Sequence, residues 1–166
     1  MNIKKEIVVN QPIDDVWEVL GNQFGEAYKW ARGLYHSKAY GNPTIEGATC
    51  SNRACDTTQG KIDEALRKFD PDHYTLEYEV IKGFPFFVKS GTNNWRLSPN
   101  GQSTKVYMDF NLETKGLIGA IMNPMMKMQM NKIIEGVLED FKHYTEKGIP
   151  SPGKERELAK QMNKAA

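Results

Sequence analysis

The chain has 166 residues, a formal net charge of +1 and a hydrophobic fraction of 39%. This length suits one domain with a core of its own, and the near-neutral charge argues against a broad nucleic-acid-binding surface, although it leaves a local patch open. No run approaches the roughly 18 apolar residues of a membrane span, and the N-terminus lacks a secretory signal pattern, so we expect a cytoplasmic protein without a membrane span.

The cysteines and histidines predict neither a disulfide nor a metal site. Cys50 and Cys55 lie in one predicted strand, which places them about 16 Å apart and on opposite faces, too far for a disulfide. His36, His73 and His143 are scattered and show no zinc-ligand spacing. No glycine-rich phosphate-binding motif occurs either. We therefore expect no metal and no cofactor.

The N-terminal segment predicts one strand and two short helices. Apolar and polar residues alternate over 2–9, as in a half-exposed strand. Pro12 then stands near a helix start, and an apolar stripe follows at helical spacing, formed by Ile13, Val16, Trp17 and Leu20. Gly21 ends this helix, and a second short helix is expected at about 25–31.

The middle of the chain predicts an antiparallel sheet. Helical periodicity disappears after residue 33, and strand-like runs alternate with turn-forming Gly, Pro, Asn and Asp residues. The later connections are short, so neighbouring strands are expected to pair as hairpins. The predicted strands lie near 34–40, 48–57, 60–69, 73–82, 88–98 and 103–114.

The longest helix is predicted from residue 117 to about 147. A broad apolar stripe runs along it, and Gly148 with Pro150 ends it. Pro124 is expected to kink or interrupt it. Seven antiparallel strands with helices at both ends form an α+β architecture. We expect a strongly curved sheet wrapped around this helix, with a cavity where the two do not meet.

The segment 148–166 is predicted as a polar tail on a domain of residues 1–147. Its start is interrupted by proline and glycine, and we expect either a short exposed helix over 154–164 or a mobile end. Its basic residues alternate with acids, which is typical of a solvated face; they are Lys154, Arg156, Lys160 and Lys164.

Several short motifs resemble those of one superfamily, in the same order along the chain. They are Ile7-Val8-Val9-Asn10-Gln11-Pro12 through Val16-Trp17-Glu18-Val19-Leu20, Trp30 and Gly33, Gly47-Ala48 with Arg53, Glu64-Ala65-Leu66, Asp70, Tyr78, and Trp95-Arg96-Leu97-Ser98-Pro99-Asn100-Gly101. Over residues 3–147 the chain resembles the START-like superfamily (SRPBCC), the polyketide cyclase/dehydrase and lipid-transport group with the birch-pollen-allergen fold. The resemblance implies a helix-grip fold. It does not select one activity, because this superfamily includes carriers, receptors and cyclases.

Strand alternation predicts which polar side chains face the helix. Glu64 shares its face with Ile62 and Leu66, so it lies among core positions. In strand 48–57 alternation permits either Arg53 or Asn52 inward, and we favour Arg53 because a buried carboxylate needs a partner. The same alternation turns three further groups inward, namely Tyr78, Asn93 and Trp95.

Two interpretations of these groups stay open. In the first, Arg53 or Tyr78 contacts an oxygen of a ligand while Glu64 holds Arg53, since a few polar groups in an apolar concavity are typical of a small-molecule site. In the second, Arg53 and Glu64 form a structural ion pair that closes the inside of the sheet.

The remaining predicted lining is apolar. It comprises Trp30, Met108, Phe110, Met122, Met125 and Met126. The methionines suit a deformable pocket wall or plain core packing. The apolar turn Phe84-Pro85-Phe86 suits either a lid over the cavity or a packed hairpin.

The first functional hypothesis is the binding of a small hydrophobic molecule, such as a lipid, an isoprenoid or a polyketide-like compound, between sheet and helix. The second is a polyketide cyclase/dehydrase-like enzyme in which Arg53, Glu64 or Tyr78 polarises a carbonyl or moves a proton. A third is a partner-binding role of the lid or the tail. A homodimer is left open.

Overall fold

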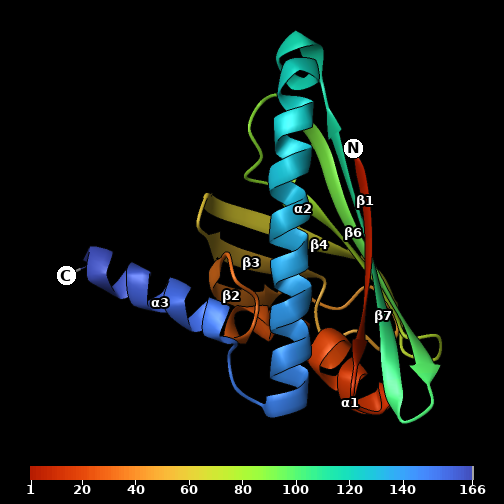
Figure 1. Cartoon of the computed structure of the whole chain (residues 1–166). Coiled ribbons are helices and arrows are strands. Elements are labelled where there is room, and N and C mark those ends of the chain that lie inside the picture. Colours follow the sequence, from red (N-terminus) through yellow and green to blue (C-terminus); the bar gives the residue numbers. More distant parts are fainter. Residues whose placement is uncertain (166) are drawn as a thin grey trace.

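The computed structural model describes the backbone of residues 1–165 and the side chains of residues 1–163. Its elements follow one another as the sequence predicts (Figure 1). They are β1 (Asn2–Val9), α1 (Ile13–Trp17), the π-helical turn η1 (Glu18–Asn22), the 3-10 helix η2 (Phe24–Lys29), β2 (Leu34–Tyr40), β3 (Asn52–Thr57), β4 (Gly60–Asp70), β5 (Thr75–Lys82), β6 (Val88–Asn100), β7 (Ser103–Thr114), α2 (Gly116–Lys147) and α3 (Pro152–Ala165).

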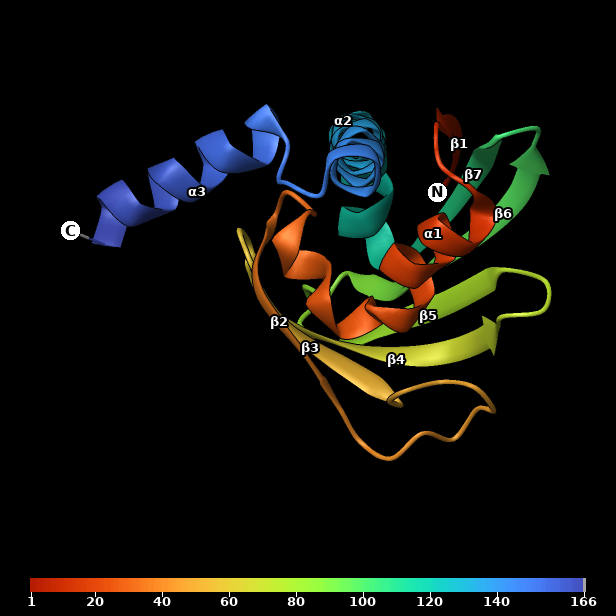
Figure 2. The same cartoon turned by 90° about the horizontal axis from the view of Figure 1, so that it is seen from below.

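The seven strands form one antiparallel sheet in the order β1-β7-β6-β5-β4-β3-β2. Consecutive strands from β2 to β7 are neighbours, as expected for short hairpin connections. The sheet curves strongly, and α2 lies over its hollow side, beside β1 (Figure 2). The predicted α+β architecture, a curved sheet around a long C-terminal helix with short helices after the first strand, is confirmed.

Two strands begin later than the sequence predicts. β3 begins at Asn52 rather than near residue 48, because β2 ends at Tyr40, whose partner is Asn52, and the chain between them is a loop. β5 begins at Thr75 because Tyr74 has a left-handed backbone with φ of 49°, which belongs to a turn and not to a strand.

Helix α2 is continuous through Pro124. A proline removes one backbone hydrogen bond from a helix but does not have to end it. The predicted interruption therefore does not occur. Among residues 1–165, no helix is long and apolar enough to cross a membrane.

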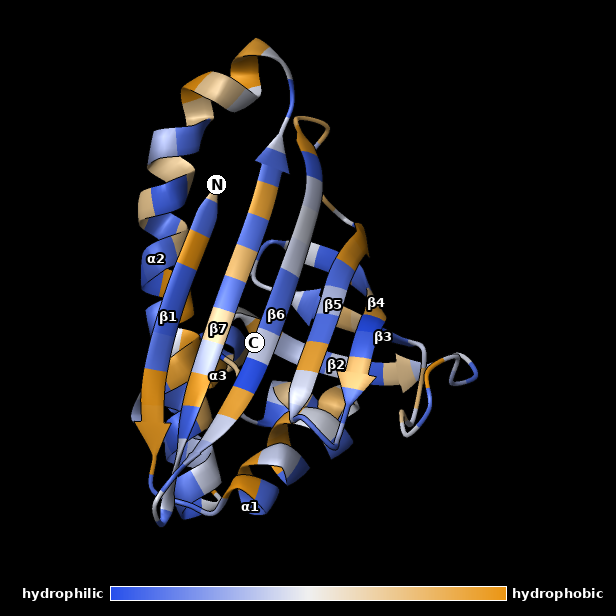
Figure 3. Cartoon of the chain, turned by 90° about the vertical axis from the view of Figure 1, so that its right-hand side faces the viewer, coloured by the Kyte–Doolittle hydropathy of each residue, from blue (hydrophilic) through white to orange (hydrophobic). Residues whose placement is uncertain are grey.

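The core lies between the sheet, the short helices and the C-terminal half of α2. Its largest fully buried members include Trp95 of β6, Leu76 of β5 and Phe141 of α2. Along the strands, apolar residues alternate with polar ones, as expected for a sheet with one face in the core (Figure 3). The N-terminal half of α2 differs, because it keeps many exposed apolar side chains.

The start of the tail is anchored to the body by buried polar contacts. Asp140 of α2 is 0% exposed and accepts hydrogen bonds from the backbone N–H of Arg32 at 2.9 Å and from its Nε at 2.8 Å. Ser151 Oγ also donates to Asp140. Lys154 is 0% exposed, and its Nζ donates to the carbonyls of Ala31, at 2.9 Å, and Leu34.

The solvated face predicted for the tail is therefore wrong at Lys154. Burial lowers the pKa of this lysine, and two backbone carbonyls replace the water that its ammonium group would otherwise bind. Beyond this anchor, α3 projects away from the sheet (Figure 1, Figure 2). The division of the chain at residue 147 stays a prediction.

We predict that Asp140→Ala lowers the free energy of unfolding by about 2–3 kcal/mol, because Arg32 and Ser151 lose a buried acceptor. Urea unfolding followed by circular dichroism measures this. The neighbouring Glu139→Ala is the control, because its carboxylate is 68% exposed and lies 3.6 Å from Arg32 Nη2. It should cost less than about 0.5 kcal/mol. Equal costs for the two variants would contradict the anchor.

Candidate functional site

An ion pair between β3 and β4 lies inside the sheet. Arg53 and Glu64 are direct cross-strand partners and are 4% and 5% exposed. Arg53 Nε donates to Glu64 Oε2 at 2.7 Å, and Nη2 lies 2.6 Å from the same oxygen. Burial alone would lower the pKa of Arg53, but the adjacent Glu64 carboxylate outweighs it and raises that pKa overall. The guanidinium is therefore always charged.

The third nitrogen of this guanidinium ties the sheet to η2. Arg53 Nη1 donates to the backbone carbonyl of Phe24 at 2.7 Å. Its guanidinium carbon also lies 4.0 Å from the centre of the Phe24 ring and 5.1 Å from that of Tyr78. All three guanidinium nitrogens thus have protein partners, which favours the structural interpretation of Arg53.

Cys55 belongs to the same cluster. Its thiol donates to Glu64 Oε2 at 3.4 Å. Burial, followed by the negative charge of Glu64, raises the pKa of this thiol to about 12, even though Arg53 opposes the shift. Only a thiolate is a good nucleophile or metal ligand. The structure therefore offers no reactive cysteine here, and within its described residues no three His, Cys, Asp or Glu side chains gather as a metal site.

A second polar cluster lies on β5 and β6. Asn93 Nδ2 donates to the Tyr78 hydroxyl at 2.8 Å. Burial, together with the charge of Glu64, raises the pKa of Tyr78 to about 12, although the positive charge of Arg53 opposes the shift. Among the described residues, five side-chain atoms are buried without a hydrogen-bond partner, and two of them, Asn93 Oδ1 and Trp95 Nε1, lie on β6 in this cluster. The others are Trp17 Nε1, Trp30 Nε1 and Thr75 Oγ1.

The two unpaired atoms of β6 form a matched set. Asn93 Oδ1 accepts hydrogen bonds and Trp95 Nε1 donates them. Their residues are 6% and 1% exposed and stand two positions apart on the inner face of β6. An unpaired buried polar atom costs roughly 1–3 kcal/mol, so a native protein normally keeps one only where water or a ligand pairs with it.

Aromatic and apolar side chains surround this cluster. Trp30 and Trp95 are far apart in the sequence, but both pack against the ring of Phe141, with centroid distances of 5.1 and 5.7 Å. Across the strands, Asn93 pairs with Phe110 and Trp95 with Met108. The structure thus brings these predicted lining residues together with the polar groups.

Beyond this cluster, the inner surfaces of sheet and helix are not fully buried. The side chains of Tyr78, Val80 and Phe110 face inward but keep part of their surface exposed. On α2 the same holds for Met122, Met126 and Met130, which recur every fourth residue and form one face. Met125 is 44% exposed and lies on another face, so it is not placed with the rest. Both apolar surfaces are therefore partly accessible to solvent in this half of the molecule.

The loop between β5 and β6 lies beside the start of α2. The Phe84 ring lies so close to Gly91, on the inner face of β6, that a Cβ on that glycine would collide with it. Phe87 accepts a hydrogen bond from the backbone N–H of Lys115, at the start of α2, at 2.8 Å. Pro85 and Phe86 are exposed. Phe84 therefore covers part of the inner face, and the tip of the predicted lid does not.

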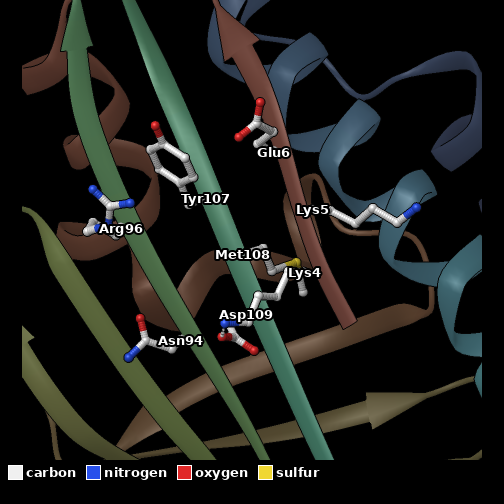
Figure 4. Close-up of a pocket in the computed structure, with 8 residues that line it drawn as sticks. All are labelled: Lys4, Lys5, Glu6, Asn94, Arg96, Tyr107, Met108 and Asp109. Atoms are coloured by element: carbon white, nitrogen blue, oxygen red, sulfur yellow. Dashed lines mark ion pairs between the residues drawn. The ribbon is translucent and has the colours of Figure 1, made fainter. Parts of the chain in front are cut away.

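Two surface hollows lie elsewhere. Figure 4 shows the larger, of about 610 Å³, on the outer face of β1, β7 and β6. Five of its eight lining residues are charged, and two of these, Lys4 and Asp109, form an ion pair at 3.2 Å. The other, of about 400 Å³, lies between α3 and β2. Neither is the cavity expected between sheet and helix, which stays a prediction.

Three residues that complete the cluster were not among the site residues predicted from the sequence. Phe24 supplies a carbonyl and a ring to Arg53, Phe141 joins the two tryptophans, and Gly91 makes room for Phe84. Only Phe141 carried a signal, because it belongs to the apolar stripe of the long helix. A backbone carbonyl that accepts a side chain leaves no trace in the residue type.

The sequence profile of the family described as polyketide cyclase/dehydrase and lipid transport matches residues 1–146. No curated protein sequence matches the chain. Similar solved structures include a START superfamily protein from Mycobacterium smegmatis, at 16% identity and a TM-score of 0.71, over 87% of this chain and 97% of that one. A truncated norcoclaurine synthase from Thalictrum flavum is 14% identical with a TM-score of 0.66, over 89% and 94%. Ara h 8.0201 is 13% identical with a TM-score of 0.64, over 87% and 97%.

We predict that Arg53→Met lowers the free energy of unfolding by about 3–5 kcal/mol, because Glu64 is left as an unpaired buried charge. Arg53→Met combined with Glu64→Leu should recover most of this loss, since the two apolar side chains need no partner. Chemical denaturation of the single and double variants measures both effects. A double variant no more stable than Arg53→Met would contradict a mainly electrostatic cost.

The pKa of Cys55 predicts a stability loss at alkaline pH. The folded pKa of about 12 exceeds the ordinary value of 9.0, so its contribution is complete below about pH 9 and falls as the pH rises toward 12. The stability difference between wild type and Cys55→Ala should therefore shrink between about pH 8 and about pH 10 in urea titrations. Cys50→Ala is the control. A constant difference for Cys55→Ala would contradict the raised pKa.

Proposed function

Because the chain belongs to the polyketide cyclase/dehydrase and lipid transport family, we propose that it binds a small hydrophobic molecule between the inner face of the sheet and α2. The observation that carries this proposal is the pair of unpaired buried atoms, Asn93 Oδ1 and Trp95 Nε1, beside an apolar surface that is only partly buried.

Affinity would come from the apolar lining. Burying about 200 Å² of apolar ligand surface contributes about 5 kcal/mol at about 25 cal/mol per Å². The half-exposed side chains of Phe110, Met122 and Met126 offer such a surface. Methionine side chains adapt to varied shapes, so this wall suits an elongated or a flat molecule, such as an isoprenoid or a polyketide-like compound.

Orientation would come from Asn93 and Trp95. A ligand hydroxyl accepts a hydrogen bond from the Trp95 indole and donates one to Asn93 Oδ1, so a single group satisfies both atoms. A ligand carbonyl only accepts hydrogen bonds, so it would pair with the indole N–H and leave Asn93 Oδ1 without a donor. Arg53 is assigned a structural role instead, because each of its three nitrogens already contacts a protein oxygen. We therefore favour a ligand with one hydroxyl on an apolar body.

The second candidate is a cyclase-like enzyme, and one observation favours it. Tyr78, with a pKa of about 12, and the Trp95 indole are neutral donors on the neighbouring strands β5 and β6, and neutral donors of this kind can polarise a carbonyl. Glu64 would then move a proton. Product formed from a poly-β-ketone substrate, and lost in Glu64→Gln, would select the enzyme over the binding protein.

We predict that Trp95→Phe weakens farnesol binding about tenfold, because the ring is kept and one buried hydrogen bond is lost. Displacement of the neutral fluorescent probe N-phenyl-1-naphthylamine measures this. Trp17→Phe is the matched control, since Trp17 Nε1 is also unpaired but packs with Phe69 and Tyr74 near α1. It should leave farnesol binding unchanged.

Native mass spectrometry of freshly purified protein complements this titration by detecting a bound molecule directly. Protein that is consistently empty and that binds neither the naphthylamine probe nor farnesol would overturn the proposal. Equal losses in the Trp95 and Trp17 variants would overturn only the role of Trp95.

A further inference from the structure

The N-terminal half of α2 and the neighbouring loop expose a large apolar surface. Leu117 is 78% exposed, Phe86 73% and Ile121 70%. Six residues of these two segments are at least 44% exposed, and together they are called the apolar tip: Phe86, Leu117, Ile118, Ile121, Met125 and Met128. Figure 3 shows apolar colour at this end of the molecule on both segments. Monomeric proteins rarely leave so many apolar side chains together in water, so this surface is expected to have a partner.

In this half α2 is apolar on two adjoining sides, and Asn123, Lys127 and Asn131 form a polar side at the same four-residue spacing. Met122, Met126 and Met130 face the sheet, whereas Leu117, Ile121 and Met125 project from another side at helical spacing. A surface helix of a globular protein normally has one apolar stripe and one polar face. The outward apolar side chains are therefore not buried by the fold, and no described residue covers them.

The charges around the apolar tip are basic. From Gly116 to Ile134, α2 contains Lys127 and Lys132 and no acidic residue, and Lys115 precedes it. The loop side is flanked by Lys82 and Lys89. The last two pair with Asp63 and Glu113, whereas the three lysines of α2 and its start have no ion-pair partner among the described residues. Exposed apolar side chains ringed by lysines match the interface of an anionic lipid bilayer.

We infer that the apolar tip docks the protein on the surface of an anionic membrane. Leucine, isoleucine and phenylalanine side chains enter the acyl boundary, and the lysines meet the lipid phosphates. The tip and the half-exposed inner surface share the same end of the molecule, because Phe87 is hydrogen-bonded to the start of α2. Docking there would place the proposed binding site against the bilayer.

A second copy of the chain fits this surface less well. A two-fold contact through the apolar tip would bring the lysines of both copies together, and the tip offers no acidic residue to offset them. An acidic protein partner is the other occupant with matching charge, and it predicts that the chain alone floats with neither of the vesicle types below.

Flotation of the full chain, without added probe, tests the inference with two vesicle types. We expect binding to phosphatidylcholine vesicles that contain about 30% phosphatidylglycerol, weak binding to phosphatidylcholine alone, and release as salt rises from about 0.1 M to about 0.5 M. Leu117→Ser with Ile121→Ser should lower partitioning at least about tenfold, because both side chains are exposed and the fold does not need them. Lys127→Glu with Lys132→Glu should lower binding to the anionic vesicles only.

Ile149→Ser is the matched control, since Ile149 is 57% exposed at the opposite end of α2. It should leave flotation unchanged. Wild-type protein that floats with neither vesicle type, or variants that float like wild type, would overturn the inference. Concentration-dependent dimers in sedimentation velocity that vanish in the Leu117 and Ile121 variant would overturn it in favour of a second copy. Probe binding measured in the same variant separates this result from the proposed function.

Discussion

The ion pair of Arg53 and Glu64 determines which polar groups remain available inside the protein. Two charges this deeply buried are tolerated only when each has partners, and here Glu64 Oε2 and all three nitrogens of Arg53 are engaged. The pair joins β3 to β4, and through the Phe24 carbonyl it joins the sheet to η2. By contrast, two neutral atoms of the inner face of β6, Asn93 Oδ1 and Trp95 Nε1, have no hydrogen-bond partner among the described residues. The chemistry proposed for the interior is accordingly neutral hydrogen bonding.

Helix α2 serves two purposes along its length. Its C-terminal half buries Ile134, Leu138 and Phe141 in the core and holds the tail through Asp140. Its N-terminal half is apolar on two sides, one facing the sheet and one facing outward, and neither is fully buried. Incomplete burial lowers stability, so a long helix with this division suggests that the unburied half is kept for binding.

Much of the fold followed from local sequence signals. Turn residues set the hairpins, the 3.6-residue period set α2, and strand alternation turned Arg53, Glu64 and Trp95 inward, because these features depend on neighbours in sequence. The contacts that complete the cluster could not be predicted. The Phe24 carbonyl and the burial of Lys154 under the chain before β2 depend on segments far apart in sequence. A lysine among acids looks solvated until the fold supplies carbonyls to it.

The most direct test of the account is the indole N–H resonance of Trp95 in nitrogen-15-labelled protein during a farnesol titration. The chain has three tryptophans, so the three indole signals can be assigned with single phenylalanine variants. The account predicts that the Trp95 signal moves as its unpaired N–H gains an acceptor, while the Trp17 signal stays in place. Farnesol that displaces the naphthylamine probe without moving the Trp95 signal would contradict the central claim.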